Sequence, residues 1–284
     1  MMKLSFMTLG CPEWDLETIC TRGREYGFTG VDFRGLQGEI DVSKTPAFTT
    51  NVAATVRLIA DNGLVTSGLS TSILLCDAAR RAENLDEARR TIDVAAALGA
   101  KNVRVFGGGD VKTIGQTEAA RIGQDCIAQI LELPGARLLS WNFETHDHWV
   151  RSSDCRLLLD AVTDPAFGAT WDVAHTMRVG LETAPQTLSA IGDRLRYVQI
   201  KDARRDPGHP KVMHDGWRYV VTGEGELDIK SAVVELNEFG YDGWLVFEHE
   251  KRWQANLDEP EIAFPAYVAW AQNVLQNLPA RPQK

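Results

Sequence analysis

Four short apolar runs in the second half of the chain each end in a side chain that can bind a metal or transfer a proton. These side chains are Glu144, Asp172, Gln199 and Glu248. Their oxygen atoms suit a hard divalent cation, and we expect Mn²⁺, with Mg²⁺ or Co²⁺ as alternatives. Without a cation, repulsion among three adjacent carboxylates would raise at least one pKa. The residue types therefore predict one divalent metal site if the four runs meet.

The arrangement of apolar residues indicates repeated strand-helix units. Strands rich in aliphatic and β-branched residues are expected at 3–8, 30–33, 64–69, 102–106, 137–144, 169–172, 197–200 and 244–248. Each is followed by a helical pattern or by a loop leading to one. Eight such units predict an α/β fold, a single-domain (β/α)8 TIM barrel over residues 1–278, with an open doubly wound sheet as the rival. Residues 279–284 are expected to form a flexible tail.

A barrel would bring the four polar side chains together. The carboxyl ends of barrel strands meet at one rim, and the alternation of side chains along a strand lets all four residues point inward. Positions 144, 172 and 199 are spaced like single βα units of about 30 residues. The longer interval before Glu248 leaves room for an active-site loop at 204–226, which we expect to act as a substrate lid.

Two helix boundaries are readable from local signals. Asp15 is expected to cap a helix that ends at Gly27. Asn84 precedes an acidic turn, so a second helix is expected over 88–98, ending at Gly99. The run 107–110 is glycine-rich but lacks phosphate-loop spacing, and we expect a flexible loop there.

Composition limits the classes of function. Lysine and arginine total 30 against 39 acidic residues, a formal charge of −9, which disfavours nucleic acid or an anionic membrane as a partner. The five cysteines are scattered and odd in number, so no disulfide framework is expected. With no signal sequence and no membrane-spanning run, a cytoplasmic location is expected.

The same motifs, together with the segment 30–35 (GVDFRG), resemble the xylose-isomerase-like TIM-barrel superfamily of sugar isomerases, epimerases and related lyases. In that superfamily one divalent metal is bound by glutamate on strand five, aspartate on strand six, usually histidine on strand seven and glutamate on strand eight. The resemblance assigns these roles to Glu144, Asp172, Gln199 and Glu248. It also implies a sugar or keto-sugar substrate and self-association into a homo-oligomer.

Gln199 departs from the superfamily pattern. It stands where the common His-x-Lys-Asp motif has histidine. Its amide oxygen can still coordinate a metal but is neutral and harder than imidazole. A similar glutamine occurs in relatives that resemble 3-dehydroshikimate dehydratases, which favours the lyase alternative.

Further side chains are expected around the substrate. His175 resembles the histidine of the superfamily's Asp-x-x-His motif, which contacts a substrate oxygen. Cations near strand ends could bind hydroxyl, carboxylate or phosphate groups, and indole rings could face a sugar. The remaining predicted binding residues are Arg34, Lys201, His146, Trp14 and Trp253. By contrast, His249 is expected to be structural and Glu250 to lie at the rim or in a salt bridge.

The first functional hypothesis is a sugar isomerase or epimerase that acts through a cis-enediolate stabilised by the metal. Glu144 and Glu248 would remove and return the proton. The alternatives are a dehydratase or lyase acting on a keto-cyclitol, a 3-dehydroshikimate-like compound or a 3-keto-sugar, and a non-catalytic sugar-binding barrel. Endonuclease-IV-like cleavage would require more metals and histidine ligands, and the acidic charge opposes it.

Overall fold

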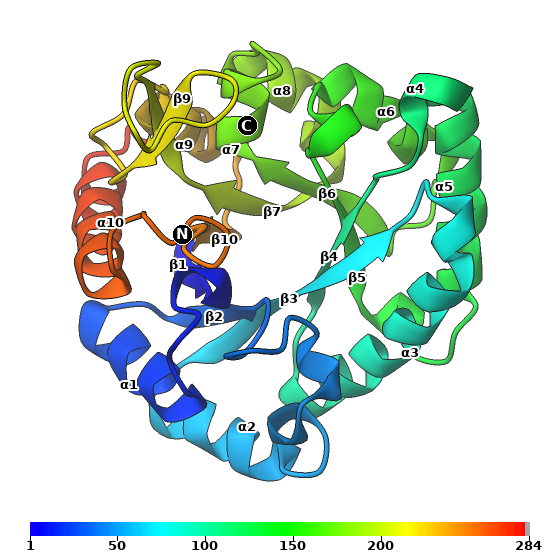
Figure 1. The fold of residues 1–284 in the computed structure, drawn as a ribbon, viewed down its shortest axis with the longest axis horizontal. Coiled ribbons are helices and arrows are strands. Elements are labelled where there is room, and N and C mark those ends of the chain that lie inside the picture. Colours follow the sequence, from blue (N-terminus) through cyan, green and yellow to red (C-terminus); the bar gives the residue numbers. More distant parts are fainter. Residues whose placement is uncertain (282–284) are drawn as a thin grey trace.

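The computed structural model describes residues 1–281 and contains one closed barrel of eight parallel strands (Figure 1). Neighbouring strands follow the order β1, β10, β7, β6, β5, β4, β3, β2. The predicted single-domain (β/α)8 TIM barrel is therefore confirmed. The strands are β1 (Lys3–Met7), β2 (Gly30–Phe33), β3 (Val65–Leu74), β4 (Asn102–Phe106), β5 (Ser140–Glu144), β6 (Phe167–Asp172), β7 (Leu195–Ile200) and β10 (Trp244–Phe247).

Helices surround the barrel and cover its outer face (Figure 1). Their bounds are α1 (Leu16–Tyr26), α2 (Val52–Asp61), α3 (Arg81–Leu98), α4 (Val111–Ile114), α5 (Gln116–Leu131), α6 (Ser152–Ala161), α7 (Val173–Arg178), α8 (Ala184–Ile191), α9 (Ile229–Phe239) and α10 (Pro260–Gln276). Within residues 1–281, none of these helices combines the length and the apolar character that a membrane span requires.

All eight expected strands are present, and the largest differences from the predicted bounds are at β3 and β5. β3 continues to Leu74 because its last residues pair with the end of β4, where Leu74 lies beside Phe106. β5 begins only at Ser140, because Ala136–Leu138 form a short 3-10 turn. That turn receives a hydrogen bond from the indole of Trp141 to the carbonyl of Ala136 (3.0 Å). Tertiary contacts thus set both boundaries.

The helix predictions were right at α1 and partly wrong at α3. Asp15 caps α1 by accepting a hydrogen bond from the Thr18 amide (2.8 Å), and Gly27 ends the helix with φ +96°. α3 ends at Gly99 as expected but begins at Arg81, so the predicted start was wrong. Asn84 lies inside the helix, where its side chain binds the backbone of Leu74 at the end of β3. A long-range contact therefore replaces the expected local cap.

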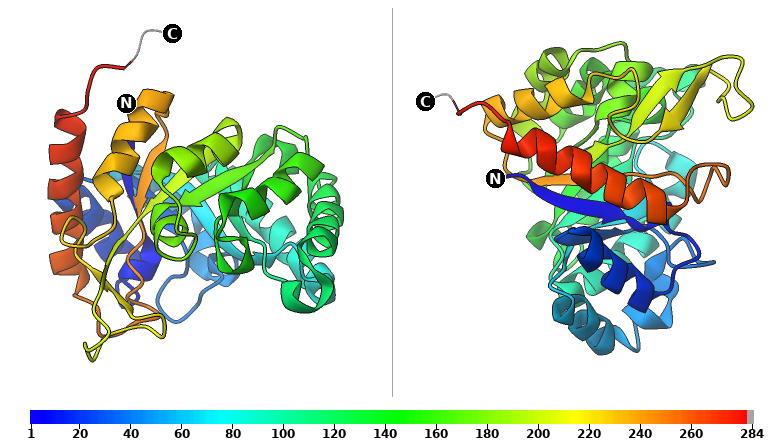
Figure 2. Two further views of the ribbon diagram at one scale, coloured as in Figure 1. Left: turned by 90° about the horizontal axis from the view of Figure 1, so that it is seen from above. Right: turned by 90° about the vertical axis from the view of Figure 1, so that its left-hand side faces the viewer.

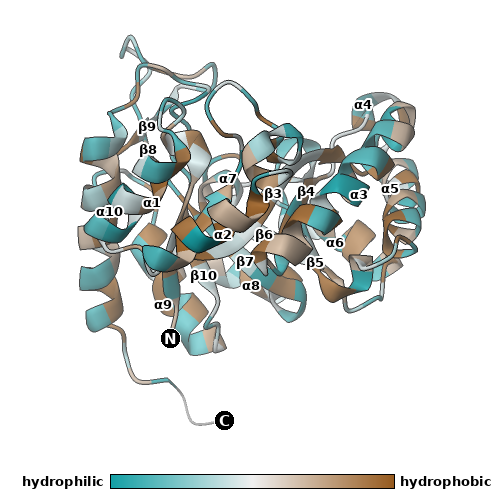
Figure 3. Cartoon of the chain, turned by 90° about the horizontal axis from the view of Figure 1, so that it is seen from below, coloured by the Kyte–Doolittle hydropathy of each residue, from teal (hydrophilic) through white to brown (hydrophobic). Residues whose placement is uncertain are grey.

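The core lies inside the barrel and between the barrel and its helices. Figure 3 shows apolar colouring concentrated on the strands, with hydrophilic colouring toward the outside of the helices. Trp141, Trp171, Phe143 and Phe167 are fully buried, as are all five cysteines, which are free thiols. The glycine-rich run after β4 is also packed: a side chain at Gly107 would meet the indole of Trp149 at 2.1 Å. The loop expected to be flexible is thus held by a close contact.

A two-stranded antiparallel hairpin interrupts the βα pattern after β7. Its strands are β8 (Asp202–Arg205) and β9 (Trp217–Val220), within the predicted long loop. Figure 2 shows the hairpin at the end of the barrel opposite to the termini. Of the predicted tail, Pro279 and Arg281 hydrogen-bond to Asn237 on α9, and residues 282–284 lie outside the described part of the chain.

Candidate metal centre

Four neighbouring strands place the predicted metal ligands at one rim of the barrel. Glu144 and Asp172 end β5 and β6, Gln199 is the penultimate residue of β7, and Glu248 directly follows β10. Asp172 and Gln199 are partners in the parallel register of β6 and β7. The four side chains are 1%, 0%, 0% and 6% exposed, in that order. The barrel therefore brings together the four residues selected from the sequence, and we refer to them as the rim cluster.

The geometry of the rim cluster fits a divalent cation. Carboxylate oxygens of Glu144, Asp172 and Glu248 all lie within 4.8 Å of one another. Neither polar atom of the buried Gln199 amide has a hydrogen-bond partner among the described residues, and neither does Oε1 of Glu144. Buried polar groups are normally paired, so unpaired oxygens at the ends of neighbouring strands indicate a ligand site. An all-oxygen donor set suits Mn²⁺ or Mg²⁺.

Arg104, in the middle of β4, was missed by the sequence analysis. Its Nε lies 3.0 Å from Oε2 of Glu144, and its Nη1 donates to the carbonyl of Thr71 (2.8 Å). The guanidinium also covers the ring of Phe106 at 3.8 Å. A charged residue in the centre of an otherwise apolar strand was the available signal, because such a residue is rarely buried without a partner.

Glu144 has an unusual acidity in this setting. Burial raises the pKa of its carboxyl to about 7, although the charge of Arg104 acts in the opposite direction. Negative charges on Glu248 and Asp172 add to the increase. A carboxyl whose pKa lies near neutrality can exchange a proton under ordinary conditions.

Lys201 follows β7 and occupies a different position from the one expected of a substrate-binding residue. Its Nζ lies 2.9 Å from Oδ2 of Asp172, 2.8 Å from Oε2 of Glu248 and 2.5 Å from Oε1 of Glu250. Burial lowers the pKa of Lys201, but the three carboxylates outweigh burial and hold it well above its usual value. An ammonium group has three N–H donors, and three carboxylates surround this one. In this arrangement it has no donor left for a substrate.

Two histidines stand beside Glu144. His175 lies on α7, whose first backbone amides are capped by Asp172: Oδ1 of Asp172 accepts from the His175 amide (2.9 Å). Its Nδ1 is 3.1 Å from the carbonyl oxygen of Thr145. Burial, reinforced by the charge of Lys201, lowers the pKa of His175 well below its usual value. His175 is therefore placed as a neutral imidazole next to the rim cluster.

His146 differs from His175 in the direction in which its surroundings shift the pKa. Its Nδ1 lies 3.0 Å from Oδ2 of Asp147, and its ring centre is 4.9 Å from that of His175. Burial lowers the pKa of His146, but Asp147 and Glu144 outweigh burial and raise it above its usual value. Ligand atoms of Glu144, His146 and His175 also lie within 4.8 Å of one another, so a metal could be held on this side of Glu144 as well.

A cavity of about 570 Å³ opens beside the rim cluster. Its walls include His146, His175, Arg178, Tyr219, Glu250, Asp215 and the backbone of Gly108 and Gly109. The cavity is large enough for a small molecule such as a sugar. Glu250 was expected either at the rim or in a salt bridge. It lines the cavity and also forms an ion pair with Lys201.

The β8–β9 hairpin contributes one wall of this cavity. Asp202 fixes its base by accepting hydrogen bonds from the amides of Gly223 (2.9 Å) and Gly225 (3.0 Å). Arg178 of α7 forms an ion pair with Asp215 near the hairpin tip, and Tyr219 lies beneath both. The predicted loop therefore reaches the site, and its movement as a lid stays a prediction.

Four of the predicted substrate-binding residues do not line this cavity: Lys201, described above, and Trp14, Trp253 and Arg34. Trp14 packs against Phe264 in the core, and its indole donates to Glu261 (3.3 Å), so the structure gives it a packing role. Trp253 is 57% exposed on the loop after β10. Arg34 is buried and donates to Ser72 (2.9 Å), and burial lowers its pKa to about 9. His249, in contrast, is structural as expected, since its Nε2 bonds to the carbonyl of Asp258 (2.8 Å).

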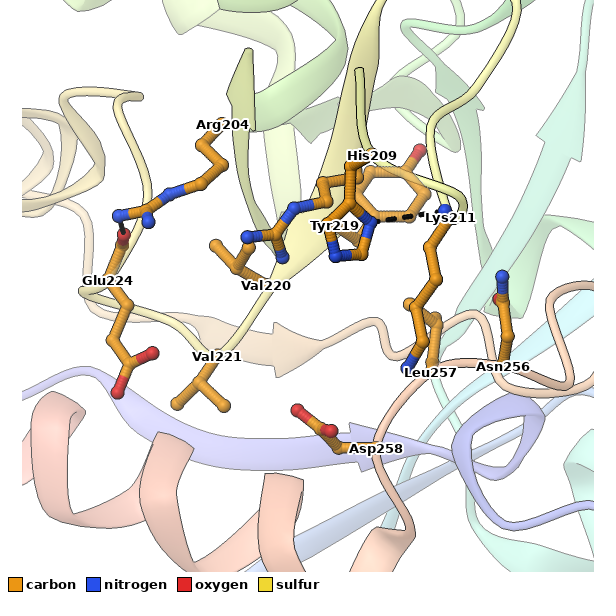
Figure 4. A pocket seen from close by; sticks show the side chains of 11 residues that line it. Arg204, His209, Lys211, Tyr219, Val220, Val221, Glu224, Asn256, Leu257 and Asp258 are labelled. Atoms are coloured by element: carbon orange, nitrogen blue, oxygen red, sulfur yellow. Dashed lines mark hydrogen bonds between the residues drawn. The ribbon is translucent and has the colours of Figure 1, made fainter. Parts of the chain in front are cut away.

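A smaller cavity of about 170 Å³ lies between β9 and the loop after β10 (Figure 4). Arg204, Lys211 and Glu224 line it from the hairpin and the segment that follows it, and Asp258 lines it from the loop after β10. It contains no member of the rim cluster. The larger cavity, in contrast, is lined by His146 and His175, which stand beside Glu144.

Comparisons with known proteins agree with this fold. A family model described as "Xylose isomerase-like TIM barrel" matches residues 20–273. An inosose dehydratase of Geobacillus kaustophilus is 26% identical over 129 residues, which is 41% of this chain and 39% of that protein. An inosose dehydratase of Lacticaseibacillus casei is 27% identical over 130 residues, 42% of this chain and 43% of that protein. The chain thus matches about two fifths of the length of these curated relatives.

Solved structures share the fold over nearly the whole chain. The IOLI protein with a bound zinc atom superimposes with a TM-score of 0.78 and 14% identity, covering 98% of this chain and all of that one. The 3-keto-D-glucoside 4-epimerase YcjR of E. coli gives a TM-score of 0.73 and 19% identity, covering 96% of this chain and all of that one. At these identities the likeness concerns the fold.

Proposed function

The chain belongs to the xylose isomerase-like TIM barrel family, and we propose that it is a divalent-metal-dependent enzyme that removes the proton beside the carbonyl group of a keto-sugar or keto-cyclitol. One observation carries the proposal: three buried carboxylates and an orphaned amide converge at the barrel rim next to a cavity of sugar size. Hydrogen bonds among the described residues do not account for the Gln199 amide or for Oε1 of Glu144.

The metal would be held by Glu144, Asp172, Gln199 and Glu248. When bound, it supplies positive charge that polarises the carbonyl oxygen of a substrate and so acidifies the adjacent C–H bond. The oxygen donors favour Mn²⁺, with Mg²⁺ or Co²⁺ as alternatives. Zn²⁺ is a further alternative, because the similar IOLI protein is described with a zinc atom.

Glu144 is the base in this proposal. Its Oε2 is fixed by Arg104, whereas its Oε1 has no hydrogen-bond partner among the described residues. Burial raises its pKa to about 7 in the protein without metal, and Oε1 is the atom that would accept the proton from a substrate. Glu248 is less free, because its Oε2 accepts a hydrogen bond from Lys201 (2.8 Å). The two glutamates are therefore unequal.

Because Oε1 of Glu144 has no partner in the described part of the chain, whereas Glu248 accepts a hydrogen bond from Lys201, we favour elimination, which needs one base, over isomerisation through a pair of glutamates. In elimination, Glu144 takes the α-proton, a carbon–carbon double bond forms, and the β-hydroxyl leaves as water after receiving a proton. His146 is the proton donor we assign, because it lines the cavity and Asp147 and Glu144 favour its protonated form. Gln199 and the matches to inosose dehydratases support the same reaction class.

Isomerisation or epimerisation is the second candidate. It is favoured by one observation, namely that Glu144 and Glu248 both belong to the rim cluster and could act as a proton-exchanging pair. A sugar-binding barrel without catalysis is the third reading. All three require the same substrate cavity, so product analysis must separate them.

Proton NMR in D₂O provides the test. Protein loaded with Mg²⁺ would be incubated with a keto-cyclitol, a 3-keto-glucoside, 3-dehydroshikimate and a ketose in turn. We expect a new vinylic signal and loss of water from at least one substrate. Incorporation of deuterium without loss of water would instead establish isomerisation or epimerisation.

Glu144→Gln is the matched variant, with Glu118→Gln on the exposed face of α5 as its control. The proposal predicts loss of at least about 10³-fold in turnover for the first and none for the second. Metal-loaded protein that binds one of these compounds but leaves every proton unexchanged would support the non-catalytic reading.

A further inference from the structure

Lys201 is a buried cation placed within the candidate metal centre. Its Nζ contacts two of the acidic members of the rim cluster, Asp172 at 2.9 Å and Glu248 at 2.8 Å. These are ion-pair distances. The third acidic member, Glu144, has its own cation in Arg104 at 3.0 Å. Each negatively charged member of the cluster therefore already has a positive partner from the protein.

The balance of charge in the rim cluster is consequently unusual. Three carboxylates face two buried cations, and the fourth member, Gln199, is neutral. A divalent cation entering this cluster is attracted by the carboxylates but repelled by Lys201 at short range and low dielectric. The repulsion depends on where the ammonium group is held.

Glu250 holds the ammonium group from the other side. It lies outside the rim cluster, in the segment after β10, and its contact with Lys201 (2.5 Å) is shorter than the contacts with Asp172 and Glu248. Its side chain faces the cavity and is 18% exposed. The position of Glu250 lets it draw Lys201 away from the metal ligands.

We propose that Lys201 is a built-in counter-ion that competes with the metal for Asp172 and Glu248, and that Glu250 anchors it so that a metal can enter. The inference rests on the proposed metal site. It explains how three buried carboxylates can coexist in the protein before a metal binds, and it makes the bound metal exchangeable. Purified protein should accordingly lose its metal on dialysis and regain it from micromolar to millimolar Mn²⁺.

Calorimetric titration with Mn²⁺ tests the competition directly. Lys201→Met is expected to bind Mn²⁺ at least about tenfold more tightly than the unaltered protein, because a repelling unit charge is removed. Its metal-free form is expected to unfold at lower temperature, since Asp172, Glu248 and Glu250 then repel one another. Mn²⁺ should restore that stability. Lys211→Met, which removes an exposed lysine of the hairpin loop, is the control and should change neither property.

Glu250→Gln tests the anchor and does not depend on the folding of the lysine variant. Glu250→Gln should weaken Mn²⁺ binding, because the ammonium group of Lys201 then pairs only with the metal ligands Asp172 and Glu248. Loss of a nearby negative charge would also weaken binding, so the double variant is decisive. If Glu250 acts through Lys201, Glu250→Gln has a much smaller effect in the Lys201→Met background.

The outcomes separate this inference from the proposed function. Unchanged or weaker Mn²⁺ binding by folded Lys201→Met, or equal effects of Glu250→Gln in both backgrounds, overturns the counter-ion role and leaves the metal site intact. If the lysine variant does not fold, unchanged binding by Glu250→Gln overturns it. Unaltered protein that binds no Mn²⁺ overturns both.

Discussion

Two buried polar clusters lie within the same barrel and are built in opposite ways. The first is the rim cluster. The second, which we call the hydroxyl chain, lies deeper and consists of Ser5, Ser67, Tyr197 and Asp32. The Tyr197 hydroxyl donates to Asp32 (2.8 Å) and lies 2.9 Å from the Ser67 hydroxyl, which lies 2.6 Å from that of Ser5.

The two clusters differ in how completely they are paired. In the hydroxyl chain, Oδ1 of Asp32 is the one side-chain oxygen without a hydrogen-bond partner among the described residues. In the rim cluster, both polar atoms of Gln199 and Oε1 of Glu144 have no such partner within residues 1–281, and Oε2 of Glu144 has only its ion pair with Arg104. Since burying an unpaired polar group costs stability, satisfied groups serve the fold and orphaned groups mark a place for a ligand. Predictions that separate folding from ligand binding test this distinction.

Glu248→Ala should have the largest effect. We expect the unaltered protein to hold about one metal per chain after chelation and reloading with Mn²⁺, and the variant to hold none. Affinity should fall by more than about 100-fold, beyond the loss typical of residues that only support a ligand. Elemental analysis of the purified proteins measures the stoichiometry, and circular dichroism checks the fold. Full occupancy in the variant would contradict the assignment of the rim cluster.

Saturation with Mn²⁺ should stabilise the unaltered protein. Binding to the folded state alone adds about 2.7 kcal/mol to the free energy of unfolding when free Mn²⁺ is 100 times its dissociation constant. Urea unfolding with and without Mn²⁺ measures the gain. Glu248→Ala should lose it and Tyr197→Phe should keep it. An equal gain in both variants would mean that Mn²⁺ acts elsewhere.

Tyr197→Phe, in contrast to Glu248→Ala, should lower the stability of the fold and leave Mn²⁺ binding unchanged. It removes the hydroxyl that links Asp32 to Ser67, so the free energy of unfolding should fall by about 1–3 kcal/mol. Mn²⁺ affinity should stay within about twofold, because the hydroxyl chain does not touch the metal. Chemical denaturation and calorimetric titration give the two values. A large loss of affinity would show that the clusters are coupled.

Asp32→Asn should have the smallest effect, which is a change in the pH dependence of the free energy of unfolding. Burial raises the pKa of Asp32 in the folded protein, although the hydrogen bond from Tyr197 acts against burial. The folded state therefore holds this proton more firmly than the unfolded state, whose pKa is about 3.9. The resulting stability is present below that value and is lost as pH rises through the folded pKa.

The measurement for Asp32 is the difference in unfolding free energy between the unaltered protein and the variant at several pH values from 4 to 7. This difference should shift in favour of Asn as pH rises, because amide cannot ionise. A difference that is constant with pH would show that Asp32 has an ordinary pKa.

Most strands and the first helix could be predicted because local sequence patterns specify them. Eight strands were recognised because buried parallel strands are short apolar runs, and α1 was recognised from Asp15 and Gly27. The start of α3 was wrong because Asn84 serves a tertiary contact with β3. Trp14 was predicted as a sugar platform, whereas in the structure it precedes α1 and packs against Phe264 of α10, a tertiary contact that no local pattern encodes.

The sequence by itself determined the barrel and the four members of the rim cluster. Both depend on periodicity and on strand ends, which are local properties that a closed barrel converts into proximity. The structure alone decided the partners: Arg104 beside Glu144, and Lys201 among three carboxylates. These pairs join residues far apart in the chain, and whether an ion pair forms depends on distances of a few ångströms that no local pattern encodes.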